Sequence, residues 1–151
     1  MNKKDWGNAV WFLLHTLAHK LLPQYSDHAR FVLPMMIRIA THLPCEQCSS
    51  HAREMLLSMQ TRPLRSKQDL IEFWREAHNR VNKRIGTPQF SLAECLEKYD
   101  KANTQLVVQN YQKVITGIRV GERGLGDSWR RGRVLDAFRK YLSTNAYMFS
   151  R

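Results

Sequence analysis

The sequence predicts an all-α protein, in which a four-helix bundle and a short fifth helix precede a C-terminal, largely helical extension. Three observations predict this fold class. Apolar residues recur at spacings of three and four through most of the first hundred residues. Serine, glycine and proline stand where such helices would begin and end. No segment there alternates apolar and polar residues convincingly enough for a strand.

The first two helices are expected over residues 6–22 and 26–42. Apolar side chains follow a helical spacing in both, and Pro23 is expected to end the first. Ser26 suits the N-cap of the second. Pro34 lies inside it and predicts either a kink or a later start.

A third helix is expected from about Pro44 to Met59, because proline suits the first helical turn. A short fifth helix is expected to begin after Ser91, a good N-cap, and to end near Tyr99.

The fourth helix has the clearest end signals. Ser66, with Asp69 three residues later, predicts a capped start. The apolar spacing continues to about Ile85, and Gly86 and Pro88 then stop the helix in the usual order.

The composition changes after residue 100, so we divide the chain into a domain over residues 1–100 and a basic extension over residues 101–151. Residues 103–120 fit a helix or a strand, the glycine-rich residues 121–127 predict a loop, and residues 128–142 predict a basic amphipathic helix. The extension holds 10 Lys/Arg against 3 Asp/Glu, and the first hundred residues hold 14 against 10. Such charge fits nucleic acid or an acidic partner, and equally a solvated surface.

The cysteine count and the hydropathy exclude two classes of protein. The chain has three cysteines, Cys45, Cys48 and Cys95. A secreted domain held by disulfides normally has more cysteines and an even number of them, so this count favours a reducing compartment. No apolar run of 18 residues is present, so we expect no membrane span. His15 and His19 break the N-terminal apolar stretch, so we expect a helix there and no signal peptide.

The stretch HLPCEQCSSH places two cysteines three residues apart at the start of an expected helix. Amide groups and partial positive charge at a helix start favour a thiolate, so Cys45 and Cys48 suit a reactive redox pair. With His42 and His51 they are also four candidate zinc ligands, although four ligands along one short helical stretch are hard to arrange tetrahedrally. Inert cysteines are the third interpretation.

Gly7, Trp11 and His15 are each four residues apart and therefore share one face of the first helix. Glycine inside a helix costs roughly 1 kcal/mol relative to alanine, which is best explained if a flat or bulky group approaches the backbone. Ordinary core packing of a tryptophan beside a hydrogen-bonded histidine is the alternative.

A polar group of side chains lies on one side of the fourth helix, where a planar polar ligand would satisfy it. Its members are His78, Asn79, Val81 and Asn82, and Lys83 and Arg84 follow them. The two basic residues would suit phosphates. The alternative is a satisfied internal network with a solvated basic end. Together with the dithiol, these faces predict a redox cofactor, and nicotinamide fits less well because no GxGxxG motif is present.

The chain resembles the Erv/ALR family of FAD-dependent sulfhydryl oxidases over residues 5–99. The resemblance rests on WGNAVWFLLHTLA (6–18), LPCEQC (43–48) and HNRVNKRIGTPQF (78–90), which occur in the family's order and approximate spacing. It implies a helical bundle that binds FAD, usually as a homodimer. It implies oxidation of substrate thiols to a disulfide, with electrons passing through FAD to O2 to give hydrogen peroxide.

The resemblance also implies residue roles. Cys45 would be attacked by the incoming thiolate, and Cys48 would lie against the flavin and pass electrons to it. The positions that match FAD contacts in the family are Gly7, Trp11, His15, His78, Asn79, Val81, Asn82, Lys83, Arg84 and Tyr99.

The chain departs from the family pattern at several positions. Many members have a structural disulfide where this chain has Arg75 and Leu92, and a lysine where it has Thr87. Cys95 is then expected to be a buried or inert thiol. No second, shuttle cysteine pair is present, so the disulfide would go directly to a thiol-containing substrate protein or to a separate thioredoxin-like protein.

These departures resemble the compact versions encoded by large DNA viruses. They imply a place in the host cytoplasm at virus assembly sites, with packaging in the virion as a further expectation. We expect no metal and no nucleic acid partner. Two rival interpretations are a zinc-stabilised basic module that binds nucleic acid and a non-catalytic adaptor that uses the extension.

Overall fold

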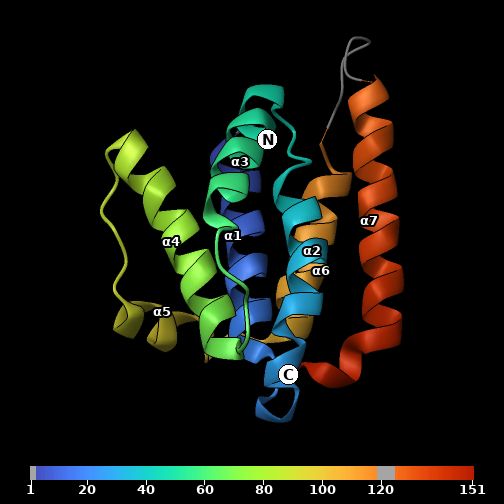
Figure 1. Ribbon diagram of the computed structural model, residues 1–151. Coiled ribbons are helices and arrows are strands. Elements are labelled where there is room, and N and C mark those ends of the chain that lie inside the picture. The colour runs from blue at the N-terminus through green and yellow to red at the C-terminus, as the bar shows by residue number, and fades with distance from the viewer. Residues whose placement is uncertain (1–2, 119–124) are drawn as a thin grey trace.

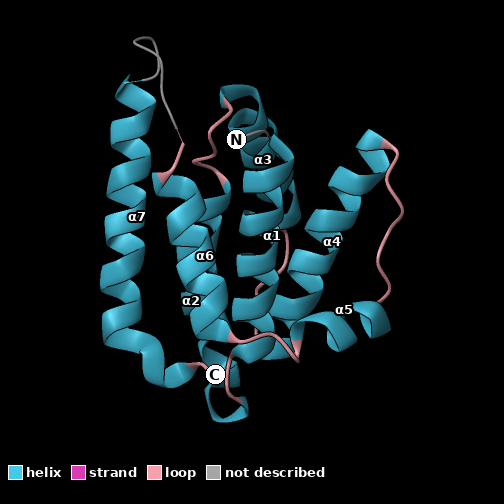
Figure 2. Ribbon diagram, turned by 180° about the vertical axis from the view of Figure 1, so that it is seen from behind, coloured by secondary structure: helices cyan, strands magenta, loops and turns pink. Residues whose placement is uncertain are grey.

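The structure is a computed structural model that describes residues 3–118 and 125–151. Its helices are α1 (Lys3–Lys20), η1 (Pro23–His28), α2 (Ala29–Ala40), α3 (Glu46–Met59), α4 (Lys67–Ile85), α5 (Leu92–Tyr99), α6 (Thr104–Thr116), α7 (Leu125–Asn145) and η3 (Ala146–Met148). Apart from an isolated bridge between Leu21 and Phe149, no strand pairing occurs in these two ranges. The all-α prediction is confirmed (Figures 1 and 2). No helix in the described ranges combines the length and the apolar character needed to cross a membrane.

Helix α1 is the central element of the bundle. Helices α2, α4, α5 and α6 all pack on it, while α7 packs on the outer side of α2 (Figure 1). Leu13 and Leu17 of α1 are fully buried, as are Met36 of α2 and Trp74 of α4. The apolar spacing of α1 therefore supplies one long buried face, against which the helices that carry the site residues are fixed.

The end signals of α4 and α5 act as the sequence predicts. Ser66 Oγ accepts from Asp69 N–H and the Asp69 side chain accepts from Ser66 N–H, which is a capping box. Gly86 ends α4 with φ 77°, a left-handed conformation that suits glycine. Ser91 begins α5 with a second capping box.

The start of α2 differs from the prediction. Ser26 does not cap it, because η1 intervenes and α2 begins at Ala29 without a side-chain cap. Ser26 Oγ instead accepts from the Lys67 N–H at the start of α4, at 2.8 Å. Pro34 lies inside a continuous α2 and is exposed, so water can hydrate the carbonyl that lacks a helical donor.

The extension packs on the helices of the first hundred residues. Residues 104–116 form a helix, which settles the choice between helix and strand, and α7 confirms the predicted basic helix. The sequence predicts a loop over residues 121–127, and residues 121–124 of it lie outside the described residues. For residues 125–127 the loop prediction was wrong, because α7 begins at Leu125.

The C-terminal residues return to the end of α1. Leu22 N–H donates to Met148 O at 2.8 Å and Ser150 N–H donates to Lys20 O at 2.7 Å. Thr104 Oγ1 donates to Ser150 O at 2.6 Å. Apolar side chains of the extension join the main core cluster, among them Tyr111, Val134, Leu135, Phe138 and Met148. The division of the chain at residue 100 remains a prediction.

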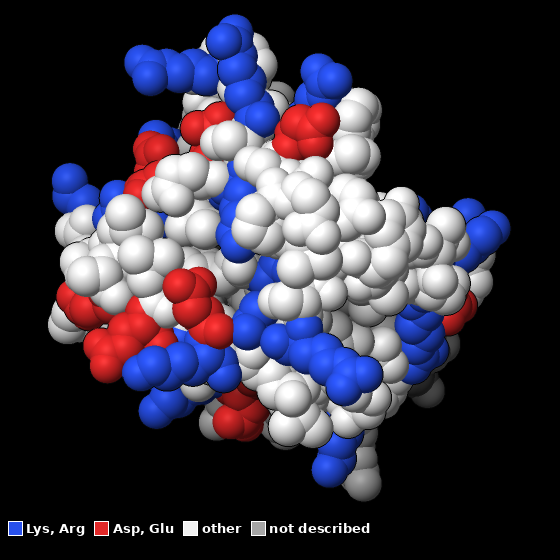
Figure 3. Space-filling model, turned by 90° about the horizontal axis from the view of Figure 1, so that it is seen from below, with Lys and Arg blue, Asp and Glu red and all other residues white. Residues whose placement is uncertain are grey.

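Basic side chains are spread over the face that is seen from below (Figure 3). In the view from below, Asp and Glu side chains lie among the Lys and Arg side chains, mostly toward one side of the molecule (Figure 3). On that face the positive charge is therefore partly offset locally, which fits the interpretation as a solvated surface better than a nucleic-acid footprint.

Candidate functional site

The predicted site residues lie on helices that meet at one end and along one side of the bundle. Helices α1 and α3 begin at the same end at which α4 finishes (Figure 1). This arrangement places the start of α1, the cysteine pair and the basic end of α4 at the same end of the bundle, with the end of α4 apart from α3 to one side (Figures 1 and 2). Helix α5 lies at the other end, beside the last turns of α1.

Cys45 and Cys48 form a disulfide at the start of α3. Cys45 is the N-cap of this helix, which begins at Glu46, so Pro44 stands one residue before the cap and not in the first turn. Cys45 Sγ accepts from Cys48 N–H at 3.2 Å. An amide of the first helical turn is thus directed at Cys45 Sγ, where it can stabilise negative charge on that sulfur. Both cysteines are half-buried against the main core.

The loop before the disulfide is tied to α3 by two side chains that the sequence did not single out. Buried Ser49 accepts from Leu43 N–H at 2.9 Å and donates to Leu43 O at 3.3 Å. Arg53 donates to Thr41 O at 3.4 Å and pairs with Glu46 at 3.2 Å. These contacts fix the approach to Cys45. Their only sequence signal is a helical spacing of three and four after Glu46.

Trp11 and His15 of α1 meet His78 of α4 and Tyr99 of α5 in a cluster of flat side chains. Trp11 and His78 stack with ring centroids 4.1 Å apart and planes 5° from parallel. His15 and Tyr99 stack at 4.4 Å and 9°. A hydrogen bond of 2.8 Å joins His15 Nε2 to His78 Nδ1. The structure therefore brings together four residues that the sequence predicts for one site, from three helices.

Both histidines of the cluster are held neutral. Burial, and then the proximity of His78, lowers the pKa of His15 well below its usual value. Burial, and then Lys98, lowers the pKa of His78 to about 4. Two neutral imidazoles can share one hydrogen bond as donor and acceptor. His15 Nδ1 is buried and has no hydrogen-bond partner among the described residues, so it can still serve a ligand.

Tyr99 is fixed by its neighbours, two of which sequence reasoning missed. Lys98 Nζ lies 5.3 Å from the centroid of the Tyr99 ring. His19 Nδ1 donates to the Asp100 carboxylate at 2.9 Å, which ties the end of α5 to α1. Burial raises the pKa of the Tyr99 hydroxyl, so it stays protonated. No local sequence pattern predicts the His19–Asp100 contact, because it joins residues 81 positions apart.

The asparagines of α4 bind the chain that follows it. Asn79 accepts from Phe90 N–H at 2.7 Å and donates to Phe90 O at 2.8 Å. Buried Asn82 donates to Pro88 O at 3.2 Å. The internal polar network considered as the alternative is therefore present. A ligand role for Asn79 and Asn82 stays a prediction.

The remaining predicted residues are Gly7 of α1 and Val81, Lys83 and Arg84 of α4. Gly7 is half-buried, and a Cβ added there would have no described atom within 4 Å, so packing within the chain does not require glycine. Val81 is half-buried, and Lys83 and Arg84 are exposed at the end of α4. Lys83 and Asn79 also line a hollow of about 330 Å³ on α4, together with Gln89.

The geometry around the cysteine pair does not favour a zinc site. The two cysteines are joined as a disulfide, and His42 Nδ1 donates to Arg38 O at 2.7 Å. In the part of the chain that the structure describes, no group of three or more His, Cys, Asp or Glu side chains is placed to hold a metal ion.

Comparison with known proteins identifies the family of this chain. The model of the Erv1 / Alr family matches residues 8–101 of this chain. The chain belongs to the Erv1 / Alr family. The crystal structure of the yeast Erv1 core shares the fold, with a TM-score of 0.57 and 24% sequence identity over 68% of this chain and 88% of that one.

Relatives of this Erv1 / Alr chain come from viruses, yeast and plants. A candidate FAD-linked sulfhydryl oxidase of invertebrate iridescent virus 3 is 33% identical over 105 residues, 66% of this chain and 68% of that protein. The mitochondrial FAD-linked sulfhydryl oxidase ERV1 of Saccharomyces cerevisiae is 29% identical over 56% of this chain and 44% of its own length. The chain thus spans about two thirds of the viral relative and less than half of the yeast one.

The residues of this Erv1 / Alr chain fit a flat dinucleotide such as FAD. The cluster offers aromatic faces, His15 Nδ1 is a buried polar atom without a partner, and the space beside Gly7 is open. Lys83 and Arg84 add exposed positive charge at the end of α4, suited to phosphates. Trp11 and His78 lie at a single stacking distance, so a ring that entered between them would have to part them.

Proposed function

We propose that this chain is a FAD-dependent sulfhydryl oxidase, which converts protein thiols to disulfides and passes the electrons through Cys45–Cys48 and FAD to O2, with release of hydrogen peroxide. The observation that carries the proposal is the disulfide that caps α3, in the same bundle end as Gly7 and the basic end of α4, in a chain of the Erv1 / Alr family. The names of its relatives support the same activity and cofactor.

The first step is thiol–disulfide exchange. An incoming thiolate attacks Cys45 Sγ, a mixed disulfide forms, and the Cys45–Cys48 bond breaks with Cys48 leaving as a thiolate. A second thiolate of the substrate then attacks its own sulfur in the mixed disulfide and releases the thiolate of Cys45. The substrate gains a disulfide, and the cysteine pair gains two electrons. The Cys48 N–H, which donates to Cys45 Sγ, stabilises the negative charge on Cys45 when its thiolate is released.

The aromatic cluster and the basic end of α4 would hold the cofactor. Trp11, His78 and Tyr99 offer flat surfaces, His15 Nδ1 offers a hydrogen-bonding atom, and Lys83 and Arg84 offer charge to phosphates. Gly7 leaves room at the helix surface, and Val81, Asn79 and Asn82 line the α4 side. Bound FAD supplies the two-electron acceptor that reoxidises the cysteine pair and delivers the electrons to O2.

The proposal is tested by an absorption spectrum of the purified protein and by oxygen uptake on addition of dithiothreitol. We expect a yellow protein with flavin absorbance, and uptake that is lost in Cys45→Ser and in Cys48→Ser. Cys95→Ser is the matched control, because Cys95 is a buried free thiol away from the pair. A colourless protein with one zinc per chain would refute the proposal and support the basic zinc module.

The partner and location are further parts of the proposal. A homodimer is supported by the family resemblance and is tested by the molar mass in solution. A thioredoxin-like protein or the final substrate receives the disulfide directly, since the third cysteine, Cys95, is buried and free. The viral relative supports a place in the cytoplasm of an infected cell, at virus assembly sites or in the virion. Fractionation of infected cells tests this location.

A further inference from the structure

His19 is a second buried histidine of α1, one turn beyond His15, and it belongs to none of the predicted sites. Its Nδ1 lies 2.9 Å from Oδ1 of Asp100, the residue that follows Tyr99. We propose that His19 and Asp100 are positioning residues of the cofactor site. They hold the Tyr99 ring against His15 and thereby slow the release of bound flavin. This inference rests on the proposed function, since it assigns two further residues to the retention of FAD.

The Tyr99 ring contacts two histidines that share one face of α1. His15 and His19 are four residues apart and therefore lie one above the other on the helix. Tyr99 stacks on His15, with ring centroids 4.4 Å apart and planes 9° from parallel. It is tilted by 49° to His19 at 5.5 Å. The position of Tyr99 along α1 therefore decides how much room a flat ligand has beside His15.

Helix α5, which carries Tyr99, depends on its attachments for its position. It has eight residues, too few for a helix that is stable by itself. Its start is attached to α4, because Asn79 binds both backbone groups of Phe90. Its end is attached to α1 through Asp100. Of these two attachments, the second is made by the residue next to Tyr99.

Asp100 is held by three of its own groups. Its N–H donates to Leu96 O within α5 at 3.1 Å. Its carbonyl oxygen accepts from Lys20 Nζ at 2.7 Å, and its carboxylate accepts from His19 Nδ1 at 2.9 Å. The lysine bond is exposed to water, whereas the imidazole of His19 is fully buried. A hydrogen bond is stronger in the low dielectric of the interior, so the His19 contact is the firmer of the two.

The core does not explain why a histidine stands at position 19. Burial lowers the pKa of His19, and the hydrogen bond to Asp100 opposes this effect without cancelling it, so the ring is neutral near pH 7. Nδ1 then carries the proton that the carboxylate accepts, and Nε2 is left as an acceptor. Among the described residues this buried Nε2 has no hydrogen-bond partner. An apolar side chain would avoid the cost of such an atom, so the site that His19 supports explains it better.

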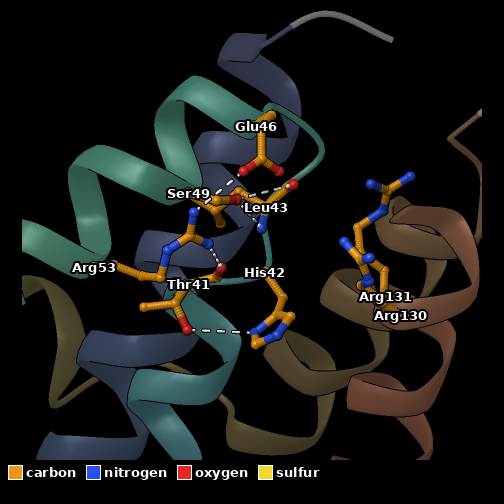
Figure 4. Close-up of a pocket in the computed structure, with 8 residues that line it drawn as sticks. All are labelled: Thr41, His42, Leu43, Glu46, Ser49, Arg53, Arg130 and Arg131. Carbon is orange, nitrogen blue, oxygen red and sulfur yellow. Dashed lines mark hydrogen bonds and ion pairs between the residues drawn. The ribbon is translucent and has the colours of Figure 1, made fainter. Parts of the chain in front are cut away.

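Both ends of the site are fixed by contacts that lie outside the chemistry itself. At one end of the bundle, Ser49 and Arg53 bind backbone groups of the loop before the disulfide (Figure 4). At the other end, beside α5 in Figure 2, His19 binds the residue after Tyr99. His19 and Asp100 both lie outside the three motifs on which the family resemblance rests. Those motifs therefore do not contain the contact that places Tyr99.

The test measures how fast flavin leaves the purified, flavin-loaded protein, from the rise in flavin fluorescence after dilution. His19→Leu removes the donor and keeps a buried side chain, while Asp100→Ala removes the acceptor at a half-exposed position that the core does not need. We expect release to be about tenfold faster in each variant, because one charge-assisted hydrogen bond is lost. Oxidation of dithiothreitol at limiting FAD should fall in parallel and recover when FAD is in excess. Far-UV circular dichroism checks that each variant keeps its helices.

Conservative variants separate positioning from a general loosening of the fold. His19→Asn places an amide where Nδ1 lies, and Asp100→Asn keeps an acceptor, so release should stay within about threefold of the wild type in both. The double variant His19→Leu/Asp100→Ala should release flavin no faster than the single variants, because all three lose the same contact. Glu97→Ala is the matched control, since Glu97 is a carboxylate of the same helix whose ion pair is with Lys101. Its release rate should equal that of the wild type.

Hydrogen exchange gives a readout that needs no turnover. The amides of residues 99–102 should exchange faster in His19→Leu and Asp100→Ala than in Glu97→Ala. A wild type that carries no flavin would overturn the proposed function and this inference with it. A flavin-loaded wild type with unchanged release in both single variants would overturn the positioning role alone. Equal acceleration in Glu97→Ala, no recovery in the two asparagine variants, or release about a hundredfold faster in the double variant would overturn it as well.

Discussion

Burial keeps both imidazole rings of the His15–His78 pair uncharged. Their nitrogens are 2.8 Å apart, so protonation of both rings would place two like charges in contact inside the bundle. Lys98, near the rings of Phe12, Phe90 and Tyr99, adds a third positive charge nearby. Desolvation and these charges act in the same direction on both rings. Both rings of the cluster therefore stay neutral at neutral pH, and their flat faces remain suited to stacking with an aromatic ligand.

We expect the protein to lose stability as the pH falls from about 6.5 to about 4. His78 has a pKa of about 4 in the folded state and an ordinary value of 6.5 when unfolded. The unfolded chain therefore binds more protons between these values, and the free energy of unfolding falls with the pH. In His78→Gln this fall should be smaller by about 2 kcal/mol, as measured by urea unfolding at pH 7 and pH 4. The same slope in wild type and His78→Gln, with His28→Gln as the surface control, would contradict the pKa assignment.

Ser49 acts on the redox pair indirectly, by holding the loop that precedes Cys45. It satisfies both backbone groups of Leu43 from within α3. Ser49→Ala should lower the free energy of unfolding by about 1–2 kcal/mol, because it leaves these groups without their partner. It should also slow oxidation of dithiothreitol, since the loop that carries Cys45 loses its tie. Ser50→Ala, one residue along, is the control and should change the free energy by less than about 0.5 kcal/mol. Equal effects in the two variants would count against this role.

The connection between α4 and α5 is held by polar contacts where many family members have a disulfide. Arg75 Nη1 donates to Phe90 O at 3.2 Å, and its guanidinium pairs with Glu72 at 2.7 Å. Asn79 binds the same peptide group of Phe90 from the next turn. A half-buried arginine thus stands at the position of the missing cysteine and still holds the segment that the disulfide would hold.

Arg75→Ala should loosen this connection while α4 itself persists. We expect a loss of about 1 kcal/mol in the free energy of unfolding, because one partly buried, charge-assisted hydrogen bond and one ion pair disappear. Hydrogen exchange should become faster for the amides of residues 87–92. Arg80→Ala is the matched control, since Arg80 also pairs with a glutamate of α4 but contacts Ser58 and not Phe90. Unchanged exchange in Arg75→Ala would show that Asn79 alone holds the segment.

The elements that could be predicted are those whose signals are local. Ser66, Gly86 and Ser91 act within three or four residues of their own helix ends, so the sequence pattern contains the whole interaction. Ser26 was assigned to the wrong helix because its partner, Lys67, is 41 residues away. Ser49 and Lys98 were missed for a related reason, since what they bind is decided by packing. The cysteine motif was recognisable because its chemistry lies within four consecutive residues.

The extension belongs to the same core as the family domain, which bears on how the chain unfolds. Helix α6 packs along α1, and Phe138 of α7 meets Tyr111 of α6 edge to face, with ring centroids 5.7 Å apart. Both rings are buried. Met148 and Ser150 then pair with the residues that follow α1 and with its end. Deletion of the extension would therefore expose one face of the central helix α1 to solvent. A single substitution in the extension tests the shared core without exposing that face.

Phe138→Ala should destabilise the family domain as well as the extension. Loss of a fully buried phenylalanine costs about 3–5 kcal/mol, and in one cooperative unit that cost lowers the unfolding temperature of every part. We expect flavin release and far-UV circular dichroism to follow a single transition at a lower temperature than in the wild type. Tyr147→Ala, a change at an exposed aromatic of the same extension, is the control and should shift the transition little. Two separate transitions in Phe138→Ala, with flavin release at the wild-type temperature, would instead support the boundary at residue 100.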